Sequence, residues 1–416
     1  MSDASTKVLP DPVAEVRSAK VRTTSITVAH VMTKPISLHF LSGQVSFVRN
    51  RGFAVHVITS PGPNVEPFTA QEGAPVHAVE MTRRVTPVED LRALWGVWRT
   101  LRRIRPHIVH GHTPKGGLLA MVGGWLARTP VRVYHLRGLP LATATGPRRA
   151  FLRLAERTSC LLAHRVLAVS PSLRAVMVEE GLCAPGKIKV LRGGSGNGID
   201  AAGRFTPQPE GVRQAMRSEH GFPPDAVVVG FVGRITRDKG FADLAAAWKL
   251  LRDREPRLHL LVVGSPERED PVPVEVLRAL EAEPRARFVG SVPPREMPRE
   301  YAAMDMVALP SHREGFPNVG LEGAAMALPV VATSATGCVD AVVDGVTGTI
   351  VPPRSPQALA AALARYASDP GLRAAHGQAG RRRVLAEFRP EDIWEAILAE
   401  YRSLLGENRG AARRVS

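Results

Sequence analysis

Two series of short apolar strands that alternate with helical segments constrain the fold of this chain more than any other feature. The first series runs from Ser25 to Leu191 and the second from Val227 to Val351. Segments such as Val227–Val232 and Leu258–Val263 are almost wholly apolar, as is typical of strands that are buried on both faces of a parallel sheet. Because alternating strands and helices predict parallel sheets covered by helices, the expected fold class is α/β, with two doubly wound, Rossmann-like domains.

The same pattern suggests where the domains begin and end, since 416 residues are many for a single hydrophobic core. Residues 1–22 lack periodicity and are expected to form a disordered tail. We expect an N-terminal domain over residues 23–198 and a C-terminal domain over residues 199–390. Residues 391–416 are expected to form a C-terminal helix and tail, and this helix is a candidate to cross back to the N-terminal domain. Gly193–Gly198 lacks the spacing of a dinucleotide-binding loop, so we interpret it as a hinge-side loop.

Positive charge is concentrated in the first half of the chain. The formal net charge is +16, and residues 1–200 contain 27 Lys and Arg against 12 Asp and Glu, whereas residues 201–416 contain 28 against 27. Such an excess favours binding to an anionic surface, either a membrane or a nucleic acid, with a merely solvated Arg-rich surface as the alternative. Aromatic residues make up only 5% of the chain and do not interleave with the basic runs, which argues against nucleic acid as a partner.

Two amphipathic segments of the first half are candidates for contact with an anionic membrane surface. Val88–Arg103 carries Trp95 and Trp98 and ends in arginines, and Arg148–His164 combines arginines with Phe151 and several leucines. Basic amphipathic helices with aromatic residues suit an anionic interface, although helices that pack on a sheet with extended arginine side chains show the same pattern. No signal peptide or membrane-spanning stretch is evident. We therefore expect a cytoplasmic protein, peripheral on the inner face of the cell membrane.

The segment Pro310–Glu322 joins a short apolar strand to a helix, which is the usual place for ligand-binding groups in an α/β domain. It contains two carboxylates eight positions apart, Glu314 and Glu322. Backbone amides of a glycine-containing loop that enters a helix suit a phosphate, whereas carboxylates suit the hydroxyls of a sugar or a ribose. One junction that offers both chemistries predicts a ligand with an anionic part and a polyhydroxyl part, such as a nucleotide-sugar.

A basic loop, Gly233–Gly240, lies between the first strand and the first helix of the second series. Arg234 and Lys239 place two cations beside a helix N-terminus, which suits a diphosphate, with an ordinary charged loop as the alternative. No D-x-D motif, which commonly holds a divalent metal on a diphosphate, occurs in the chain, and the three cysteines match no metal-binding spacing. We therefore expect no metal and no cofactor, and a leaving group stabilised by protein cations.

These motifs resemble the signature of the large family of retaining glycosyltransferases often called family 4, which have the GT-B fold. The resemblance rests on Glu314-x7-Glu322, with Pro310-Ser311 before it and Ala327–Val331 after it. It implies two Rossmann-like domains that face a cleft, and transfer of a hexose-type sugar from a nucleoside diphosphate, expected to be UDP, with retention at the anomeric carbon. The subtype resembles bacterial enzymes that build capsule, exopolysaccharide or glycan precursors. The basic first half of the chain favours a lipid-linked acceptor such as a polyprenyl diphosphate sugar, or another saccharide acceptor.

The resemblance also implies roles for residues of the second half. Arg234 and Lys239 would neutralise the pyrophosphate of the donor. Glu314 would contact hydroxyls of the transferred sugar, and Glu322 would contact the ribose, although a first-turn carboxylate favoured by the helix dipole is the alternative for Glu322. The other expected donor-binding residues are Gly233, Val289, Gly315, Phe316, Pro317, Asn318 and Val319. The expected catalytic residues are Glu314, Arg234, Lys239 and His112.

In the first half, His112 and Lys115 follow a strand and open a helix, where the family often has a His-x-His pattern. They are expected to meet an acceptor hydroxyl or phosphate, with a structural histidine pair as the alternative. Arg137 stands where many relatives have a histidine near the reacting sugar, and we expect it to hold an acceptor diphosphate instead. The family's first loop often has paired glycines, and here only Gly43 is present as an acceptor-binding candidate.

Two other classes of protein remain compatible with the sequence. A nucleotide-sugar epimerase of the same fold would release UDP without any acceptor, and the pattern at Glu314 and Glu322 argues against it. A nucleic-acid-binding protein is suggested only by the charge, and its binding would weaken steeply as salt is raised. Release of UDP that depends strictly on an acceptor would identify a transferase.

Overall fold

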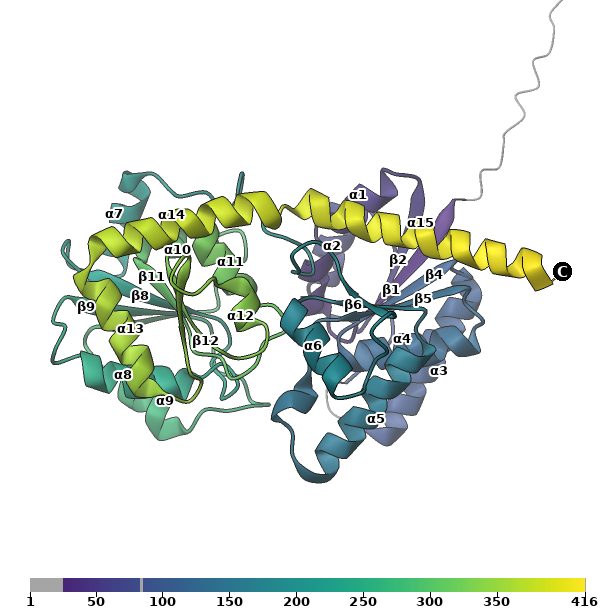
Figure 1. Cartoon of the computed structure of the whole chain (residues 1–416), viewed down its shortest axis with the longest axis horizontal. Coiled ribbons are helices and arrows are strands. Elements are labelled where there is room, and N and C mark those ends of the chain that lie inside the picture. Colours follow the sequence, from purple (N-terminus) through teal and green to yellow (C-terminus); the bar gives the residue numbers. More distant parts are fainter. Residues whose placement is uncertain (1–24, 83–84, 416) are drawn as a thin grey trace, which may run out of the picture.

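The computed structural model describes residues 25–82 and 85–415 and contains two parallel sheets, each covered by helices on both faces (Figure 1). The sheets lie in separate halves of the molecule, which confirms the expectation of two Rossmann-like domains. The expected disordered tail, residues 1–22, lies outside the described residues. Within the described ranges, no helix combines the length and the apolar character needed to cross a bilayer.

The N-terminal domain contains seven parallel strands in the order β3-β2-β1-β4-β5-β6-β7. The strands are β1 (Ile26–Val31), β2 (Phe53–Thr59), β3 (Val76–Ala78), β4 (Ile108–His112), β5 (Val131–Leu136), β6 (Arg165–Ala168) and β7 (Ile188–Val190). The helices, with two short 3-10 helices marked η, are η1 (Pro35–Leu41), α1 (Gln44–Arg49), α2 (Val65–Glu72), α3 (Pro87–Ile104), α4 (Pro114–Leu126), η2 (Pro140–Thr143), α5 (Gly146–Leu162) and α6 (Pro171–Glu179).

Helices cover both faces of this sheet because its strands are apolar on both faces. On one face, α3, α4 and α5 lie side by side and bury residues such as Val97 and Leu119 against the strands. On the other face, η1, α1 and α2 bury Leu41, Val45 and Phe68. The sequence did not predict α2, which buries little more than one aromatic side chain and therefore lacks an apolar stripe.

The segment Leu38–Asn50 has a helical pattern in the sequence, but it does not form one continuous helix. The 3-10 helix η1 ends at Leu41, and α1 begins at Gln44 after Gly43, which has a φ of +77°. A Cβ atom at Gly43 would also overlap the indole ring of Trp394. The break therefore follows from a backbone conformation and a close approach that favour glycine.

The C-terminal domain contains six parallel strands in the order β10-β9-β8-β11-β12-β13. The strands are β8 (Val227–Val232), β9 (Leu258–Val263), β10 (Ala286–Gly290), β11 (Met306–Leu309), β12 (Val330–Thr333) and β13 (Gly348–Val351). The helices are α7 (Glu210–Glu219), α8 (Phe241–Leu251), α9 (Val274–Glu281), α10 (Met297–Ala303), α11 (Asn318–Ala325), α12 (Cys338–Ala341), α13 (Pro356–Ser368) and α14 (Pro370–Glu387).

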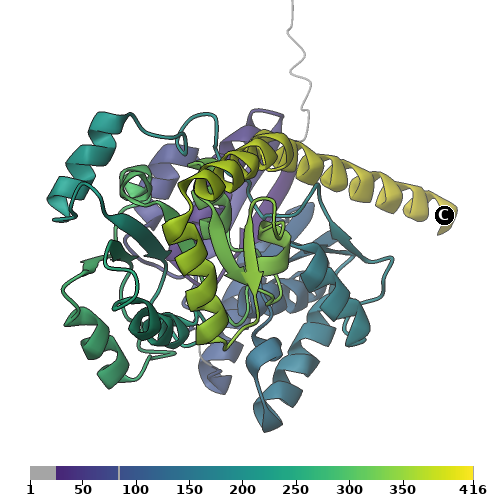
Figure 2. The ribbon, with the colours of Figure 1, turned by 60° about the vertical axis from the view of Figure 1, so that its left-hand side comes forward.

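The last helix, α15 (Pro390–Val415), leaves the C-terminal domain and packs on the N-terminal one. Figures 1 and 2 show α14 and α15 following one another along the same side of the molecule, across both domains. Ile397 and Tyr401 of α15 are buried in the N-terminal core together with Val28 and Phe53. The chain therefore passes between the domains twice, once near Gly198 and once at Pro390, where these two segments touch.

Candidate functional site

The loop from Pro310 to Pro317 joins β11 to α11 and brings together residues that are far apart in the sequence. The Nζ atom of Lys239 donates to Oε1 of Glu314 over 2.5 Å, and the hydroxyl of Ser311 donates to the same oxygen over 2.8 Å. Lys239 follows β8 and Glu314 follows β11, and these two strands are neighbours in the sheet. The carboxyl ends of adjacent parallel strands meet at one edge, which is why residues 75 positions apart form an ion pair.

Glu322 lies on α11 and accepts a hydrogen bond of 2.8 Å from the hydroxyl of Tyr301. Burial raises the pKa of Glu322, and the hydrogen bond from Tyr301 partly offsets this effect. Glu322 is the fifth residue of α11, whose first turn has no acidic residue. Its position is therefore not explained by the dipole of the helix N-terminus, and its carboxylate is held by a specific partner that the sequence did not reveal.

Arg234 is bound to a carboxylate partner, as Lys239 is. Its guanidinium forms an ion pair with Glu267, and its side chain remains about half exposed. The neighbouring Gly233 has a φ of +139° and lies so close to Gly264 that a Cβ atom on Gly264 would overlap the Gly233 oxygen. The two predicted phosphate-binding cations are therefore held by Glu267 and Glu314 at the same edge of the sheet.

Gly315 and Phe316 contact the N-terminal domain. The hydroxyl of Ser170 donates to the backbone oxygen of Gly315 over 2.7 Å, and a Cβ atom on Gly315 would overlap the backbone oxygen of Arg137. Phe316 packs against the cores of both domains. This part of the predicted donor-binding loop therefore lies in the contact between the domains.

The remaining predicted donor-binding residues lie in the C-terminal domain. Pro317 is buried, Asn318 begins α11, and Val319 packs against the C-terminal core. Val289 lies in β10 beside Gly290, where the pairing with β9 is irregular, and is partly buried against the same core. Of these residues, Val289, Asn318 and Val319 keep partly accessible surfaces.

Four buried histidines and one arginine meet at the carboxyl ends of β1, β4 and β5. They are His30, His110, His112, His135 and Arg137. The sheet register aligns His30 with His110, and His112 with His135. The rings of His30 and His112, and those of His110 and His135, stack across neighbouring strands. The sequence singled out only His112 and Arg137 for function, although the histidines at adjacent strand ends were a signal for the other three.

The hydrogen bonds of this cluster fix how His112 is protonated. The Nε–H of Arg137 donates to Nδ1 of His112 over 3.1 Å, so the ring hydrogen of neutral His112 is on Nε2 and is donated to Nδ1 of His30 over 2.9 Å. Burial lowers the pKa of His30 to about 3 and that of His112 well below its ordinary value, and the charge of Arg137 adds to the effect. The histidines are therefore neutral at physiological pH.

Arg137 is a partly buried cation without a carboxylate partner among the described residues. Burial lowers its pKa to about 9. Its guanidinium lies over the ring of Phe40, 4.6 Å from the centroid, and its Nη2 atom is 3.5 Å from the oxygen of Gly196. Charges enclosed by protein are normally paired, so a guanidinium that is hydrogen-bonded only to neutral groups is unusual, and the backbone of the same residue lies against Gly315.

Three of the histidines are also close enough together to be compared with a metal site. One ring nitrogen from each of His30, His110 and His112 lies within 4.8 Å of the others. If Nε2 of neutral His112 bound a metal, the ring hydrogen would have to be on Nδ1. Nδ1 instead accepts a hydrogen bond from the N–H of Arg137, and two N–H groups would then face one another. The hydrogen bonds from Arg137 to His112 and on to His30 therefore account for this cluster better than a metal does.

Gly43 and Lys115, two of the expected acceptor-binding residues, are engaged inside the N-terminal domain. The amide of Gly43 donates to Oε1 of Glu72 over 2.6 Å, and this carboxylate occupies the N-terminus of α1. Lys115 forms an ion pair with Asp90 and donates to the hydroxyl of Thr82 over 3.0 Å. Both groups therefore already have protein partners in this structure.

Family models match both domains of the chain. The model described as "Glycosyl transferases group 1" matches residues 212–383, and the "Glycosyl transferase 4-like domain" matches residues 42–194. The chain is 31% identical over 381 residues to the capsular polysaccharide biosynthesis glycosyltransferase CapM of Staphylococcus aureus, covering 92% of this chain and 98% of CapM. The chain therefore belongs to the group 1 family of glycosyltransferases, and the resemblance to family 4 is confirmed.

Other relatives agree with this assignment. A D-inositol 3-phosphate glycosyltransferase of Kineococcus radiotolerans is 32% identical over 332 residues, which cover 74% of this chain and 73% of that protein. The fold is similar to HepE of Anabaena in complex with UDP-glucose, with a TM-score of 0.76, 21% identity, and coverage of 91% of this chain and 100% of HepE. A sucrose-phosphate synthase of Thermosynechococcus elongatus gives a TM-score of 0.75 at 21% identity, covering 92% of this chain and 100% of that one. The expected GT-B fold is thus confirmed.

Proposed function

We propose that this glycosyltransferase moves a hexose-type sugar from a UDP-sugar to a lipid-linked saccharide acceptor, with retention at the anomeric carbon. The observation that carries the proposal is the pairing of Lys239 with Glu314 at the carboxyl edge of the C-terminal sheet. The site presents a cation suited to a diphosphate and a carboxylate suited to sugar hydroxyls side by side. The complex of HepE with UDP-glucose and the name of CapM support the donor and the polysaccharide context.

In this proposal, the residues of the C-terminal domain bind the donor and stabilise the leaving group. As the bond between the sugar and the diphosphate breaks, negative charge builds on the diphosphate, and Arg234 and Lys239 would stabilise it. Glu314 would accept hydrogen bonds from hydroxyls of the transferred sugar, and Glu322 from the ribose. Because both cations already have carboxylate partners, donor binding must rearrange the pairs with Glu267 and Glu314.

The N-terminal domain would present the acceptor to this site. The backbone of Arg137 lies against Gly315, next to Glu314, and its guanidinium has N–H groups left over after it donates to His112 and Gly196. We assign it to the acceptor, near the hydroxyl that attacks the sugar. His112 would act through Arg137 as a positioning residue, since both of its ring nitrogens are already hydrogen-bonded.

A membrane-facing surface on the N-terminal domain supports a lipid-linked acceptor. Three neighbouring helices, α3, α4 and α5, expose large apolar residues that are each between 45% and 76% accessible: Val88, Leu91, Trp95, Trp125, Leu126, Phe151, Leu154 and Leu161. Exposed arginines lie on the same helices, among them Arg92, Arg99, Arg102, Arg103, Arg148 and Arg157. Of the acidic residues on these helices, only Glu89 is exposed.

The charge of this surface favours an anionic membrane over a second copy of the chain, because two copies would bring arginines against arginines. The structure changes which residues are expected to contribute. Trp98 is partly buried, and Arg149 and Arg153 are both held by Glu180. We propose peripheral association with the cytoplasmic face of the membrane through the exposed apolar residues and the exposed arginines.

A donor screen tests the proposed function directly. Purified enzyme would be mixed with UDP-sugars, with and without decyl diphosphate glycosides as acceptors, and release of UDP would be measured. The proposal expects UDP release that requires both substrates and retains the anomeric configuration. UDP release that is independent of any acceptor would instead indicate the epimerase alternative. The nucleic-acid-binding alternative needs a separate binding assay, in which the protein would bind nucleic acid at low salt and lose this binding as the salt concentration is raised.

A further inference from the structure

Tyr301 and Glu322 connect the two helices that flank β11. Tyr301 lies in α10, before this strand, and Glu322 lies in α11, after it. The hydroxyl of Tyr301 donates to Oε2 of Glu322 over 2.8 Å, and the tyrosine side chain is completely buried. The hydrogen bond therefore attaches the carboxylate that is expected to meet the ribose to the core of the C-terminal domain.

The packing of its ring fixes the position of the Tyr301 hydroxyl. The ring of Phe205 meets the tyrosine ring edge-on, with 6.1 Å between the ring centroids. Both rings belong to the core cluster that also contains Leu321, the residue next to Glu322. Because close-packed cores leave large side chains little room to change rotamer, the hydroxyl is held in place before any ligand binds.

Glu322 keeps acceptor capacity that this hydrogen bond does not use. An ionised carboxylate offers about four acceptor positions on its two oxygens. Among the described residues, Tyr301 is the only hydrogen-bond donor to this carboxylate, so Oε1 has no protein partner there. The side chain of Glu322 is also partly exposed. Two vicinal hydroxyls, such as those of a ribose, can therefore bind with one hydroxyl on each oxygen.

The neighbours of Glu322 favour its ionised form, which only accepts hydrogen bonds. Burial raises the pKa of this carboxyl group, and the hydrogen bond from Tyr301 and the positive charge of Arg204 act against that effect. The guanidinium of Arg204 lies over the ring of Phe205, 4.5 Å from its centroid. A neutral acceptor would satisfy the tyrosine hydroxyl without the desolvation of a charge, so the choice of a carboxylate points to a ligand with hydroxyl groups.

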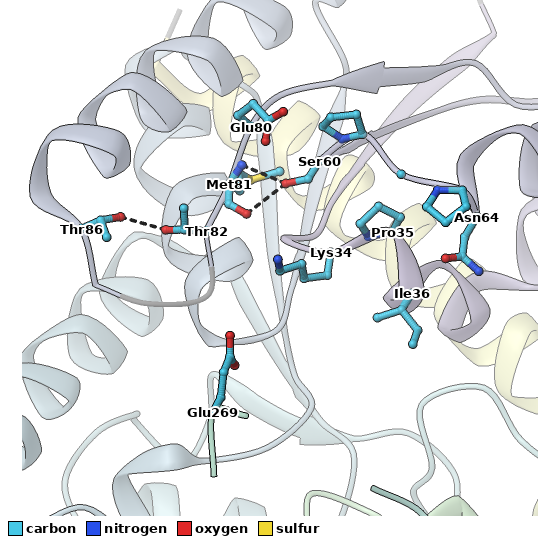
Figure 3. A pocket seen from close by; sticks show the side chains of 13 residues that line it. Lys34, Pro35, Ile36, Ser60, Asn64, Glu80, Met81, Thr82, Thr86 and Glu269 are labelled. Carbon is cyan, nitrogen blue, oxygen red and sulfur yellow. Dashed lines mark hydrogen bonds between the residues drawn. The ribbon is translucent and has the colours of Figure 1, made fainter. Parts of the chain in front are cut away.

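The pair formed by Tyr301 and Glu322 is separate from a cavity of about 450 Å³ that opens in the N-terminal domain (Figure 3). The wall of the cavity includes Lys34 and Glu80 of that domain and Glu269 of the C-terminal domain, and neither member of the pair lines it. A nucleotide in this cavity would not touch the pair. Variants of the pair therefore report on nucleotide binding at α10 and α11 alone.

We propose that Tyr301 is a positioning residue for the nucleotide of the donor. It holds the carboxylate of Glu322 where it accepts hydrogen bonds from both ribose hydroxyls, and it thereby makes the enzyme select ribonucleotides over deoxyribonucleotides. Tyr301 acts through Glu322 and does not itself contact the nucleotide, because its hydroxyl is bound to the carboxylate. This inference rests on the proposed function, in which Glu322 meets the ribose.

Calorimetry with UDP and with dideoxy-UDP, whose ribose lacks both hydroxyls, tests this role. The wild-type enzyme is expected to bind UDP more tightly than dideoxy-UDP. Tyr301→Phe removes the hydroxyl and keeps the ring against Phe205. It should weaken UDP binding about three- to tenfold, because the Glu322 side chain must then be immobilised when the ligand binds. The affinity for dideoxy-UDP should not change, since that probe has no hydroxyl for the carboxylate to accept.

Two further variants show whether Tyr301 acts through Glu322. When Glu322 is already replaced by alanine, adding Tyr301→Phe should leave the affinity for UDP unchanged. The matched control is Tyr366→Phe, which also removes a buried hydroxyl from the C-terminal domain. The Tyr366 hydroxyl is 2.7 Å from Nδ1 of His376, and its ring belongs to a different core cluster of the same domain. This control should change the affinity for neither nucleotide.

Several results would overturn the role of Tyr301 while leaving the donor assignment in place. They are an unchanged affinity of Tyr301→Phe for UDP, an equal loss for UDP and dideoxy-UDP, and a further loss in the Glu322→Ala background. Equal binding of the two nucleotides by the wild type would overturn the inference without any variant, so the test does not depend on the folding of Tyr301→Phe. A wild-type enzyme that binds no UDP would instead contradict the proposed function itself.

Discussion

Replacement of Lys239 by methionine removes one charge from the proposed donor site while keeping the length of the side chain. Lys239 is the cation that contacts Glu314, and the two side chains are only 20% and 13% exposed. Removing one partner of a largely buried ion pair leaves the other charge unpaired, which costs about 3–5 kcal/mol when both are fully buried. Because Glu314 keeps its 2.8 Å hydrogen bond from Ser311 and some contact with water, we expect a smaller loss of about 1–3 kcal/mol in unfolding free energy.

The effect on catalysis should be larger than the effect on folding. A preorganised group that stabilises developing charge typically contributes a factor of about 100–1,000 to kcat, and we expect Lys239→Met to lose this much in UDP release. The double variant with Glu314→Gln should recover stability but not activity, since no unpaired charge remains. Lys249→Met on α8 is the matched control. Urea unfolding and a coupled UDP assay measure both quantities, and kcat within about threefold of wild type would refute the assigned role of Lys239.

Four further predictions follow from particular contacts. Glu322→Gln should weaken UDP binding, because only the carboxylate accepts two ribose hydrogen bonds. For the same reason, the affinity of the wild-type enzyme for UDP should fall as pH decreases through the raised pKa of Glu322, and calorimetry at several pH values should show no such fall for the variant. Gly315→Ala, whose Cβ would overlap the oxygen of Arg137, should slow transfer more than it weakens UDP binding, and equal effects would argue against an interdomain role. Burial raises the pKa of Glu156 to about 7, so the folded protein keeps a proton on this carboxyl that the unfolded chain releases. The free energy of unfolding of the wild type should therefore decrease by about 3 kcal/mol as pH rises from 4.5 to 7, and urea titrations of Glu156→Gln should lack this decrease. Replacing Trp95 and Leu161 together by serine should reduce cosedimentation with anionic liposomes, whereas Val274→Ser in the C-terminal domain should not; unchanged cosedimentation would remove the membrane proposal.

The fold and the centre of the candidate site were accessible from the sequence because both depend on local patterns. Apolar runs separated by helical segments determined the parallel sheets. The Glu-x7-Glu pattern and the basic loop before α8 lie at strand ends, and adjacent parallel strands bring such ends together. Hence the sequence could predict that Lys239 and Glu314 lie close together, although not that they form an ion pair.

The contacts that the sequence missed depend on which residues face one another across strands and between domains. Glu267 and Tyr301, the partners of Arg234 and Glu322, belong to no local motif. His30 and His135 join His112 only through the register of β1, β4 and β5. Phe316, expected to bind the donor, packs between the two domain cores, and that contact depends on how the domains dock.

The burial of Arg137 is a further property that no local pattern reveals. In the sequence it is one of many arginines, and its position suggested only a departure from the family motif. In the structure it is the guanidinium that fixes the ring hydrogens of two histidines and has no carboxylate partner in the described part of the chain. These properties of Arg137 depend on the uncharged groups that surround its side chain, and these groups come together only in the folded domain.

A crystal structure of the enzyme with a non-transferable UDP-sugar tests the donor site most directly. The account predicts nitrogen atoms of Arg234 and Lys239 within about 3.2 Å of diphosphate oxygens, with Glu314 at the sugar and Glu322 at the ribose. A nucleotide bound elsewhere, with the ion pair between Lys239 and Glu314 intact and Arg234 still on Glu267, would contradict it.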